Sequence, residues 1–131
     1  MTQAHFELQT LLDTIRALRG PQGCPWDRRQ TSLSLLKYLR SECDELHEAI
    51  TGDDSRNMCE ELGDLLYIII MISEINKDLN KFELSDVLHD INEKLIRRHP
   101  HVFAGVTYEN EEQLTAQWQA IKAEEKRKNT V

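Results

Sequence analysis

Four acidic side chains in the middle of this sequence are placed where they could share one chemical task. They form two pairs whose members are three residues apart, Glu42 with Glu45 and Glu61 with Asp64. Residues three apart project from one face of a helix. Because one short turn separates the pairs, we expect two antiparallel neighbouring helices that direct all four carboxylates at one point. We call these four residues the acid cluster.

The acid cluster can be interpreted in two ways. Most glutamates are solvated at the surface, and this fits Glu42 and Glu45, which lie off the apolar stripe of their helix. It fits Glu61 and Asp64 less well, because their face continues into a strongly apolar segment. Partly buried carboxylates repel one another, and a hard divalent cation such as Mg²⁺, which prefers oxygen ligands, offsets that repulsion. The pattern alone favours a metal site slightly over a solvated surface.

Other catalytic and metal-binding patterns are weaker in this chain. A di-iron bundle needs Glu-x-x-His pairs, whereas the sequence has only Asp-x-x-His, at residues 44–47 and 86–89. His99 and His101 flank a proline and are better explained by the shape of a loop than by metal binding. The sequence contains no phosphate-binding P-loop and no glycine-flanked serine of the nucleophile-elbow type.

Five helices are expected to position these groups. Apolar residues recur at helical spacing in five segments, at about residues 3–19, 31–51, 56–76, 85–99 and 110–128. Residues 20–30 and 99–108, which contain most of the Gly and Pro, are expected to be loops. The last helix ends in the charged run 124–128, which we expect to be frayed.

The most apolar segment, residues 65–72, is apolar on every side. A buried strand would also explain it, but the helical period extends over more residues, so a helix in a bundle core or a subunit interface is favoured. The helix at 85–99 is expected to bury a narrower face, formed by Val87, Leu88, Ile91, Leu95 and Ile96. The sequence thus predicts a single all-α domain over residues 1–131. We expect a bundle of about five helices with a four-helix-bundle-like core completed by dimerisation.

Composition narrows the class of protein further. Of 131 residues, 40% are apolar and 30% charged, which is typical of a globular domain. The net charge of −7 argues against nucleic acid or an anionic membrane as a partner. Three cysteines without a Cys-x-x-Cys motif favour a reducing compartment. No secretory leader is visible, and the longest apolar run is too short to span a membrane, so we expect a cytoplasmic protein.

Several motifs together resemble those of the MazG family of nucleoside triphosphate pyrophosphohydrolases. The resemblance extends over about residues 8 to 127. The motifs are Gly-Cys-Pro-Trp-Asp at 23–27, Glu42-x-x-Glu45, Glu-Glu-Leu-Gly-Asp-Leu-Leu at 60–66, the stretch 93–103 that ends in His-Pro-His-Val-Phe, and Trp118-x-x-Ile121-Lys122-x-Glu124-Glu125-Lys126.

This resemblance implies an all-α enzyme, typically a homodimer with a tetramer as the alternative, whose sites lie at or near the subunit interface. It implies hydrolysis of canonical or damaged nucleoside triphosphates to monophosphate and pyrophosphate, often as clean-up of the nucleotide pool. The acid cluster would hold Mg²⁺, with Mn²⁺ as a substitute, and would be catalytic. The substrate contacts would be Glu60, Lys94, Arg98, Trp118 and Lys122.

The residue types are compatible with those implied roles. Lys94 and Arg98 are four apart and form one cationic helix face that can hold phosphates, although cations near a helix C-terminus are also favoured by its dipole. The dipole alone is sufficient to explain Arg97. Trp118 can stack on a base, or it can be a core or interface residue; Lys122 lies on the same face.

One position departs from the family pattern. The family's acid motif begins with an additional Glu, which is Ser41 here, and Ser cannot act as a carboxylate. A catalytically weak or inactive domain that binds a nucleotide or a protein partner is therefore the main alternative. A purely structural interaction domain with a solvated acid cluster is a third hypothesis.

Overall fold

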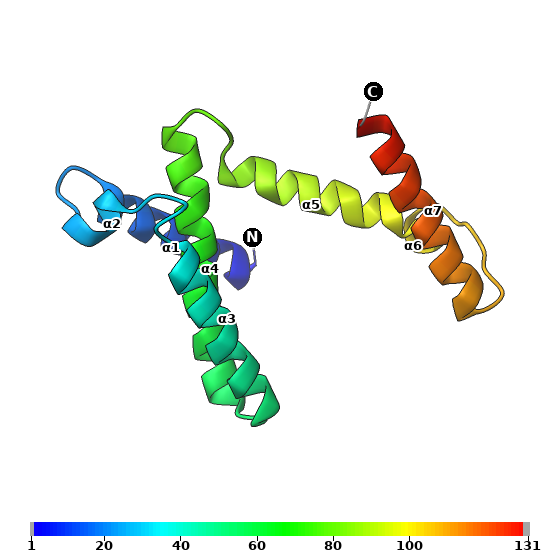
Figure 1. The fold of residues 1–131 in the computed structure, drawn as a ribbon, viewed down its shortest axis with the longest axis horizontal. Coiled ribbons are helices and arrows are strands. Elements are labelled where there is room, and N and C mark those ends of the chain that lie inside the picture. The colour runs from blue at the N-terminus through cyan, green and yellow to red at the C-terminus, as the bar shows by residue number, and fades with distance from the viewer. Residues whose placement is uncertain (1, 130–131) are drawn as a thin grey trace. The chain divides into compact units, whose positions relative to one another are not determined.

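The computed structural model describes residues 2–129, and within them every regular element is a helix (Figure 1). The elements are α1 (Gln3–Arg19), α2 (Pro25–Arg29), α3 (Leu36–Thr51), α4 (Ser55–Asp78), α5 (Leu84–Arg98), α6 (Pro100–Phe103) and α7 (Glu111–Asn129). The all-α class is confirmed, and the apolar segment 65–72 is helical. No described helix is long and apolar enough to cross a membrane.

Two segments expected to be loops each contain a short helix. Both α2 and α6 begin at a proline, which suits the first turn of a helix because its missing N–H would have no partner there. The helix expected from residue 31 begins only at Leu36. Before it, Thr31 and Ser34 exchange hydrogen bonds, each backbone N–H donating to the other's hydroxyl at 2.8 and 3.0 Å, and this local turn replaces the first helical turn.

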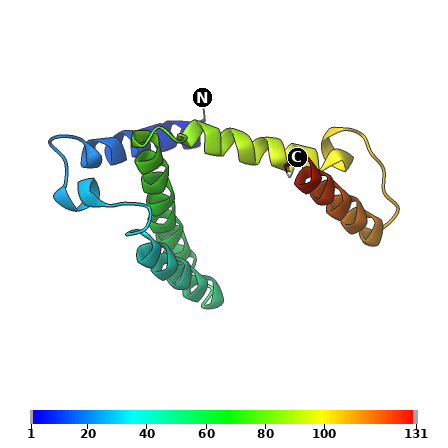
Figure 2. The same cartoon turned by 45° about the horizontal axis from the view of Figure 1, so that its top comes forward.

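The chain divides into two compact units, one ending at Leu84 and the other beginning at Ser85. In the first unit α3 and α4 form an antiparallel hairpin, and α1 packs against α4 (Figure 2). Its core is apolar and comes mainly from α1 and α4. The core residues are Leu12, Ile15, Leu35, Ile68, Ile70, Met71, Ile75 and Leu84.

A tight turn after α3 sets the hairpin that carries the acid cluster. The N–H of Gly52 donates to the carbonyl of Glu48 and ends α3, and Asp53 takes a left-handed backbone conformation with φ of 52°. The carboxylate of Asp54 then accepts from the N–H of Asn57 at 3.1 Å and caps α4. The chain thus reverses within three residues, as the spacing of the two acid pairs predicted.

The segment around α2 is fixed to the first unit by polar contacts. A Cβ at Gly23 would lie 2.1 Å from the carbonyl oxygen of Leu18, so only glycine fits this close approach. Asp27 is buried, and its carboxylate accepts a hydrogen bond from the hydroxyl of Tyr67 on α4. Its carbonyl accepts from the Arg19 guanidinium at 2.7 Å. One buried aspartate therefore connects α2 to both α1 and α4.

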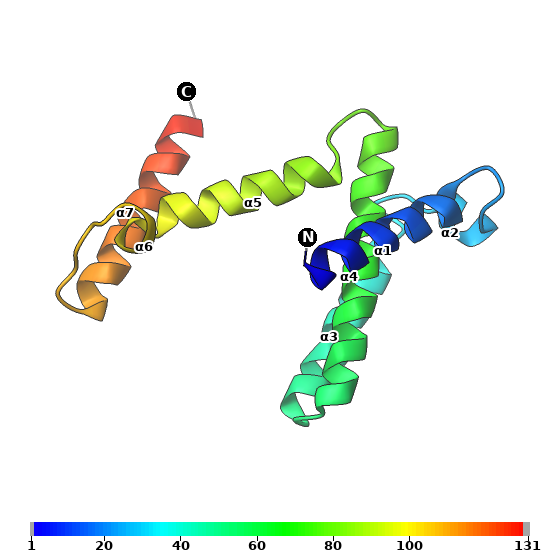
Figure 3. The same ribbon diagram turned by 180° about the vertical axis from the view of Figure 1, so that it is seen from behind.

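The second unit is held together differently. Its helices α5, α6 and α7 fold back on one another at the C-terminal end of α5 (Figure 3), but no side chain from 85 to 129 is fully buried. The prediction that α5 buries one apolar face is wrong for the single chain. Leu88, Ile91 and Leu95 are each nearly half exposed, Ile96 is 38% exposed and Val87 is only partly buried. Helical spacing predicts that a face is apolar, but it does not identify what covers that face.

We expect the Tyr67–Asp27 hydrogen bond to contribute measurably to stability. Burial and this bond both raise the pKa of Tyr67, so the hydroxyl stays protonated and able to donate. Tyr67→Phe leaves the buried carboxylate without that donor and should lower the free energy of unfolding by about 1–3 kcal/mol. Urea denaturation followed by circular dichroism measures this.

The matched control is Tyr38→Phe, which removes the same atom from a partly buried ring that packs on Trp26 at 5.2 Å. It should change stability by less than about 0.5 kcal/mol. Equal losses in the two variants would show that the Tyr67–Asp27 bond has no special role.

Candidate functional site

The structure brings the acid cluster together. One carboxylate oxygen from each of Glu42, Glu45, Glu61 and Asp64 lies within 4.8 Å of the other three. The first two side chains come from α3 and the last two from α4, as the paired spacing predicted. Glu61 is only 8% exposed, Glu42 is partly buried, and Glu45 and Asp64 are exposed.

The burial of Glu61 follows from its position on α4. Residue 68, two turns further along the same face, is a core isoleucine, so that face turns inward toward the core. The expectation that this face leads into buried territory is confirmed for Glu61. It is wrong for Asp64, whose side chain remains accessible. The cluster is therefore buried on the side of Glu61 and exposed on the side of Glu45 and Asp64, and we call this exposed side the open rim.

The electrostatics of the cluster are unfavourable without a cation. Burial raises the pKa of Glu61 from its ordinary value of 4.5 to about 7, and the neighbouring carboxylates, Glu45 first, add to the shift. The pKa of Glu42 is raised as well, chiefly by burial and then by Glu45 and Asp64. The second carboxylate oxygens of Glu42 and Glu61 are buried without a hydrogen-bond partner.

A divalent metal ion fits this arrangement. None of the ion pairs described within residues 2–129 involves these four acids, so no Lys or Arg neutralises them. The donors are all carboxylate oxygens, the hard ligands that Mg²⁺ and Mn²⁺ prefer, and two of those oxygens lack any protein partner. The open rim leaves room for water and phosphate oxygens on the exposed side.

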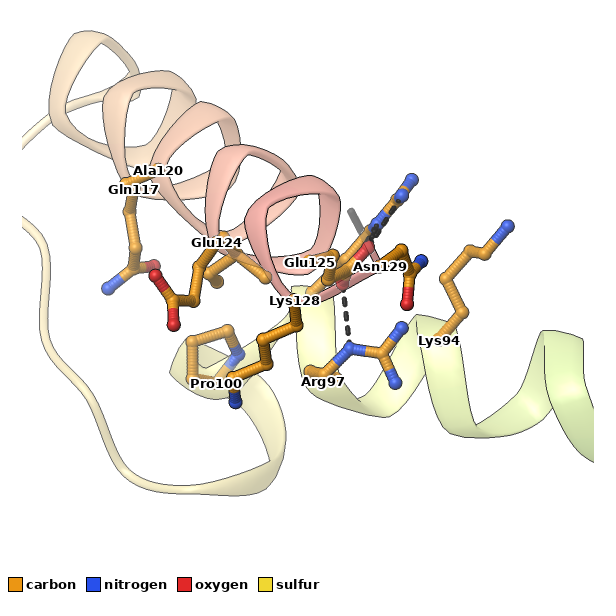
Figure 4. Close-up of a pocket in the computed structure, with 11 residues that line it drawn as sticks. Lys94, Arg97, Pro100, Gln117, Ala120, Glu124, Glu125, Lys128 and Asn129 are labelled. Carbon is orange, nitrogen blue, oxygen red and sulfur yellow. Dashed lines mark hydrogen bonds and ion pairs between the residues drawn. The ribbon is translucent and has the colours of Figure 1, made fainter. Parts of the chain in front are cut away.

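The second unit carries the basic and aromatic residues. Lys94 and Arg98 lie on α5 and line one cavity of about 890 Å³ beside α7, which we call the α5–α7 cavity (Figure 4). Trp118, on α7, is 37% exposed and is therefore not a core residue of this chain. The ammonium of Lys122 lies 4.5 Å from the centre of the Trp118 ring, a cation–π contact.

Arg98 is the common member of these groups. It lines the α5–α7 cavity with Lys94, a cavity of about 490 Å³ with Lys122, and one of about 230 Å³ with Trp118. The smaller cavity also contains His99 and His101. The expected substrate residues Lys94, Arg98, Trp118 and Lys122 thus gather within the second unit. Glu60 is exposed on α4 and does not belong to the acid cluster.

Sequence reasoning missed Glu125. The run 124–128 was expected to be frayed, but α7 continues to Asn129 and Glu125 is only 16% exposed. Its carboxylate accepts from Arg97 at 2.7 Å and from Arg98 at 2.8 Å. Arg97, which the helix dipole alone seemed to explain, therefore has a specific partner. The available signal was the alignment of Glu125 with Trp118 and Lys122, because steps of four and three keep them on one face of the helix.

Comparisons with known proteins agree with this architecture. Residues 30–103 match the MazG nucleotide pyrophosphohydrolase domain family. The uncharacterised Bacillus subtilis protein YabN is 46% identical over 93% of this chain and 25% of its own length. A Thermotoga maritima protein named nucleoside triphosphate pyrophosphohydrolase/pyrophosphatase MazG is 44% identical over 98% of this chain and 49% of its own. The crystal structure of a MazG-related protein from Thermotoga maritima has a TM-score of 0.72 at 30% identity and covers 88% of this chain and 98% of that one.

These matches and the helical architecture define an all-α nucleotide pyrophosphohydrolase-type domain. The chain belongs to the MazG nucleotide pyrophosphohydrolase domain family, because the family match covers more than half of its residues. The chain spans between a quarter and about half of the length of the two curated relatives named above.

The raised pKa of Glu61 gives a stability test. Without metal, the folded state keeps this proton up to about pH 7, whereas the unfolded chain releases it near 4.5. The folded state therefore binds more protons between these values, and stability falls as pH rises through this window. In EDTA, the melting temperature of the wild type should fall between pH 5 and pH 8 by more than that of Glu61→Gln, which has no titrating group at position 61.

Added Mg²⁺ should reverse this loss at pH 8 in the wild type, because a ligand that binds only the folded state stabilises it by mass action. The Glu61→Gln variant should respond much less. Scanning calorimetry with and without Mg²⁺ measures both effects. A melting temperature that is insensitive to Mg²⁺ in the wild type would favour a solvated acid cluster.

Proposed function

We propose that this chain, acting as one domain over residues 1–131, is a Mg²⁺-dependent nucleoside triphosphate pyrophosphohydrolase. It would cleave NTP with water to nucleoside monophosphate and pyrophosphate, in a nucleotide clean-up role. The observation that carries the proposal is the acid cluster, with four carboxylate oxygens within 4.8 Å of one another and no ion pair to a Lys or Arg among residues 2–129. The name of the Thermotoga maritima relative, nucleoside triphosphate pyrophosphohydrolase/pyrophosphatase MazG, supports the reaction class.

In this proposal Glu42, Glu45, Glu61 and Asp64 hold the metal ion. When bound, Mg²⁺ supplies Lewis-acid polarisation of a phosphate oxygen and lowers the pKa of a coordinated water. Glu45, which is exposed, or Glu42, which is partly buried, takes the proton of the attacking water. The bond that forms joins the water oxygen to the α-phosphorus, and the bond that breaks releases pyrophosphate.

The second unit would recognise the nucleotide. Lys94 and Arg98 balance the charge of the phosphates and of the departing pyrophosphate. Trp118 offers an exposed ring face on which a base can stack, and Lys122 lies against that ring. Glu60 is kept as a candidate substrate contact because it is exposed. The net charge of −7 makes nucleic acid and anionic membranes poor partners. Three cysteines without a Cys-x-x-Cys motif suit a reducing compartment such as the cytoplasm.

Ser41 supports one alternative. It lies exposed on α3 next to Glu42, where it offers a hydroxyl in place of a carboxylate. A chain in which this position had lost an essential carboxylate would bind nucleotide with Mg²⁺ but release no product. Restoring the acid with Ser41→Glu would then raise turnover.

The reaction can be tested with a panel of nucleoside triphosphates and Mg²⁺, with products separated by chromatography. We expect monophosphate and pyrophosphate, and no product with EDTA. Glu61→Gln should lower turnover at least about 100-fold, since it removes a buried ligand of the metal.

The control is Glu48→Gln, an exposed glutamate on the same hairpin outside the cluster, which should keep wild-type turnover. Diphosphate and orthophosphate as products would refute cleavage between the α- and β-phosphates. Nucleotide binding without any product would favour the non-catalytic alternative.

We also propose that the protein is a homodimer, with a tetramer as the larger alternative. Apolar stripes remain exposed at helical spacing on two helices. They are Leu62, Leu66 and Ile69 on α4, and Leu88, Ile91 and Leu95 on α5. Monomers seldom leave such continuous apolar surface in water, and a second copy would cover it.

Replacing Leu88 and Ile91 together by Gln should shift the protein toward monomer in light scattering after gel filtration. Ile50→Gln is the control, because Ile50 is 57% exposed at the end of α3 and lies outside both stripes. A wild-type protein that is monomeric at micromolar concentration would refute the dimer.

A further inference from the structure

Glu125 joins two arginines across the second unit. Its carboxylate accepts from Nε of Arg97 at 2.7 Å through one oxygen. The other oxygen accepts from Nη2 of Arg98 at 2.8 Å and from its Nε at 3.2 Å. Glu125 lies on α7 and both arginines lie on α5, 27 residues away from it in the case of Arg98. The bond therefore fixes two helices to each other.

The contact leaves Arg98 able to bind an anion. A guanidinium has five N–H donors, and the side-on contact to Glu125 uses one on Nε and one on Nη2. Three donors remain, and Arg98 lines the α5–α7 cavity and the two smaller cavities. A carboxylate held at one edge also fixes the plane of the guanidinium, so the remaining donors have a defined direction.

Buried apolar side chains do not hold α5 and α7 together in place of this ion pair. No side chain between 85 and 129 is fully buried, whereas Glu125 is 16% exposed and Arg98 is 21% exposed. These are among the better shielded groups where α5 and α7 meet. The two arginines hold the pKa of Glu125 at about 2, so its carboxylate remains charged at neutral pH.

We propose that Glu125 is a positioning residue for phosphate recognition. It orients Arg98 so that the remaining N–H groups of the guanidinium donate hydrogen bonds to the phosphate oxygens of the substrate. The identity of the phosphates as those of a nucleotide rests on the proposed function; the orientation of Arg98 does not. The same carboxylate could instead compete with an incoming anion for Arg98. These two roles predict opposite effects of removing it.

Inorganic tripolyphosphate in EDTA is the probe, since it reports the cationic site without metal or base. Calorimetric titration of the full chain should show binding about tenfold weaker for Glu125→Ala than for wild type, the size of one lost charge-assisted hydrogen-bond constraint. The matched control is Glu112→Ala, an exposed glutamate in the first turn of α7 that lines none of these three cavities. It should change affinity less than about twofold.

Either unchanged or tighter binding in Glu125→Ala would overturn the proposal, the latter because it would identify a competitor. A second measurement needs no variant. In the wild type, the Nε–H of Arg98 should exchange with water more slowly than that of Arg56, an exposed arginine on α4, as seen by NMR. Equal exchange rates would overturn the proposal even if Glu125→Ala failed to fold.

The two proposals can fail separately. Wild-type protein that binds tripolyphosphate but hydrolyses no nucleotide refutes the proposed function alone. If wild type is active, Glu125→Ala should raise KM about tenfold with kcat changed less than about threefold, since the orientation of a binding group is lost. Wild-type KM in that variant refutes the role of Glu125 alone.

Discussion

The repulsion among four carboxylates is the constraint around which the first unit is built. Glu42, Glu45, Glu61 and Asp64 would separate if their backbones were free, because like charges at this distance destabilise one another. They remain together because the capped turn at residues 52–54 and the core packing of α4 fix the hairpin independently of the acids. The raised pKa of Glu61 is the residual cost of this arrangement, and it is a cost that a bound cation would remove.

The support of the hairpin explains why the surrounding sequence is so particular. Asp27, Arg19 and Tyr67 form a buried polar connection that holds α2 against α1 and α4. Two turns beyond Tyr67 on the same face of α4, Glu74 is buried and pairs with Arg16 of α1. Since each connection joins α4 to another element, the half of α4 that follows Glu61 and Asp64 is held at two points. Rigid support of this kind keeps the four carboxyl groups close together in spite of their repulsion.

How far the sequence predicted this structure depended on the range of the interactions involved. The acid cluster was predicted correctly because it follows from spacing on two helices and one short turn, all of which are local. The helical starts at Pro25 and Pro100 were missed because proline was taken only as an interruption. Glu125 was missed because its partners lie 27 residues away for Arg98, and helical spacing contains no information about such pairs. The face of α5 was predicted to be buried but is exposed, because helical spacing shows that a face is apolar and does not show which surface covers it.

The acid cluster of the first unit and the basic residues that line the cavities of the second are kept in place by different physical means. The acid cluster gathers four carboxyl groups that form no ion pair with a Lys or Arg among residues 2–129, and two of their oxygens are buried without a hydrogen-bond partner. The basic residues of the second unit are defined by partial neutralisation, because Glu125 takes up part of the bonding capacity of Arg97 and Arg98. In a chain with a net charge of −7, attraction of a polyanion by overall charge is not available. If the chain binds a polyanionic substrate as proposed, binding depends on a few cations held in defined directions. An anionic neighbour such as Glu125 then favours binding when the gain from orienting Arg98 exceeds the loss from partly neutralising its charge.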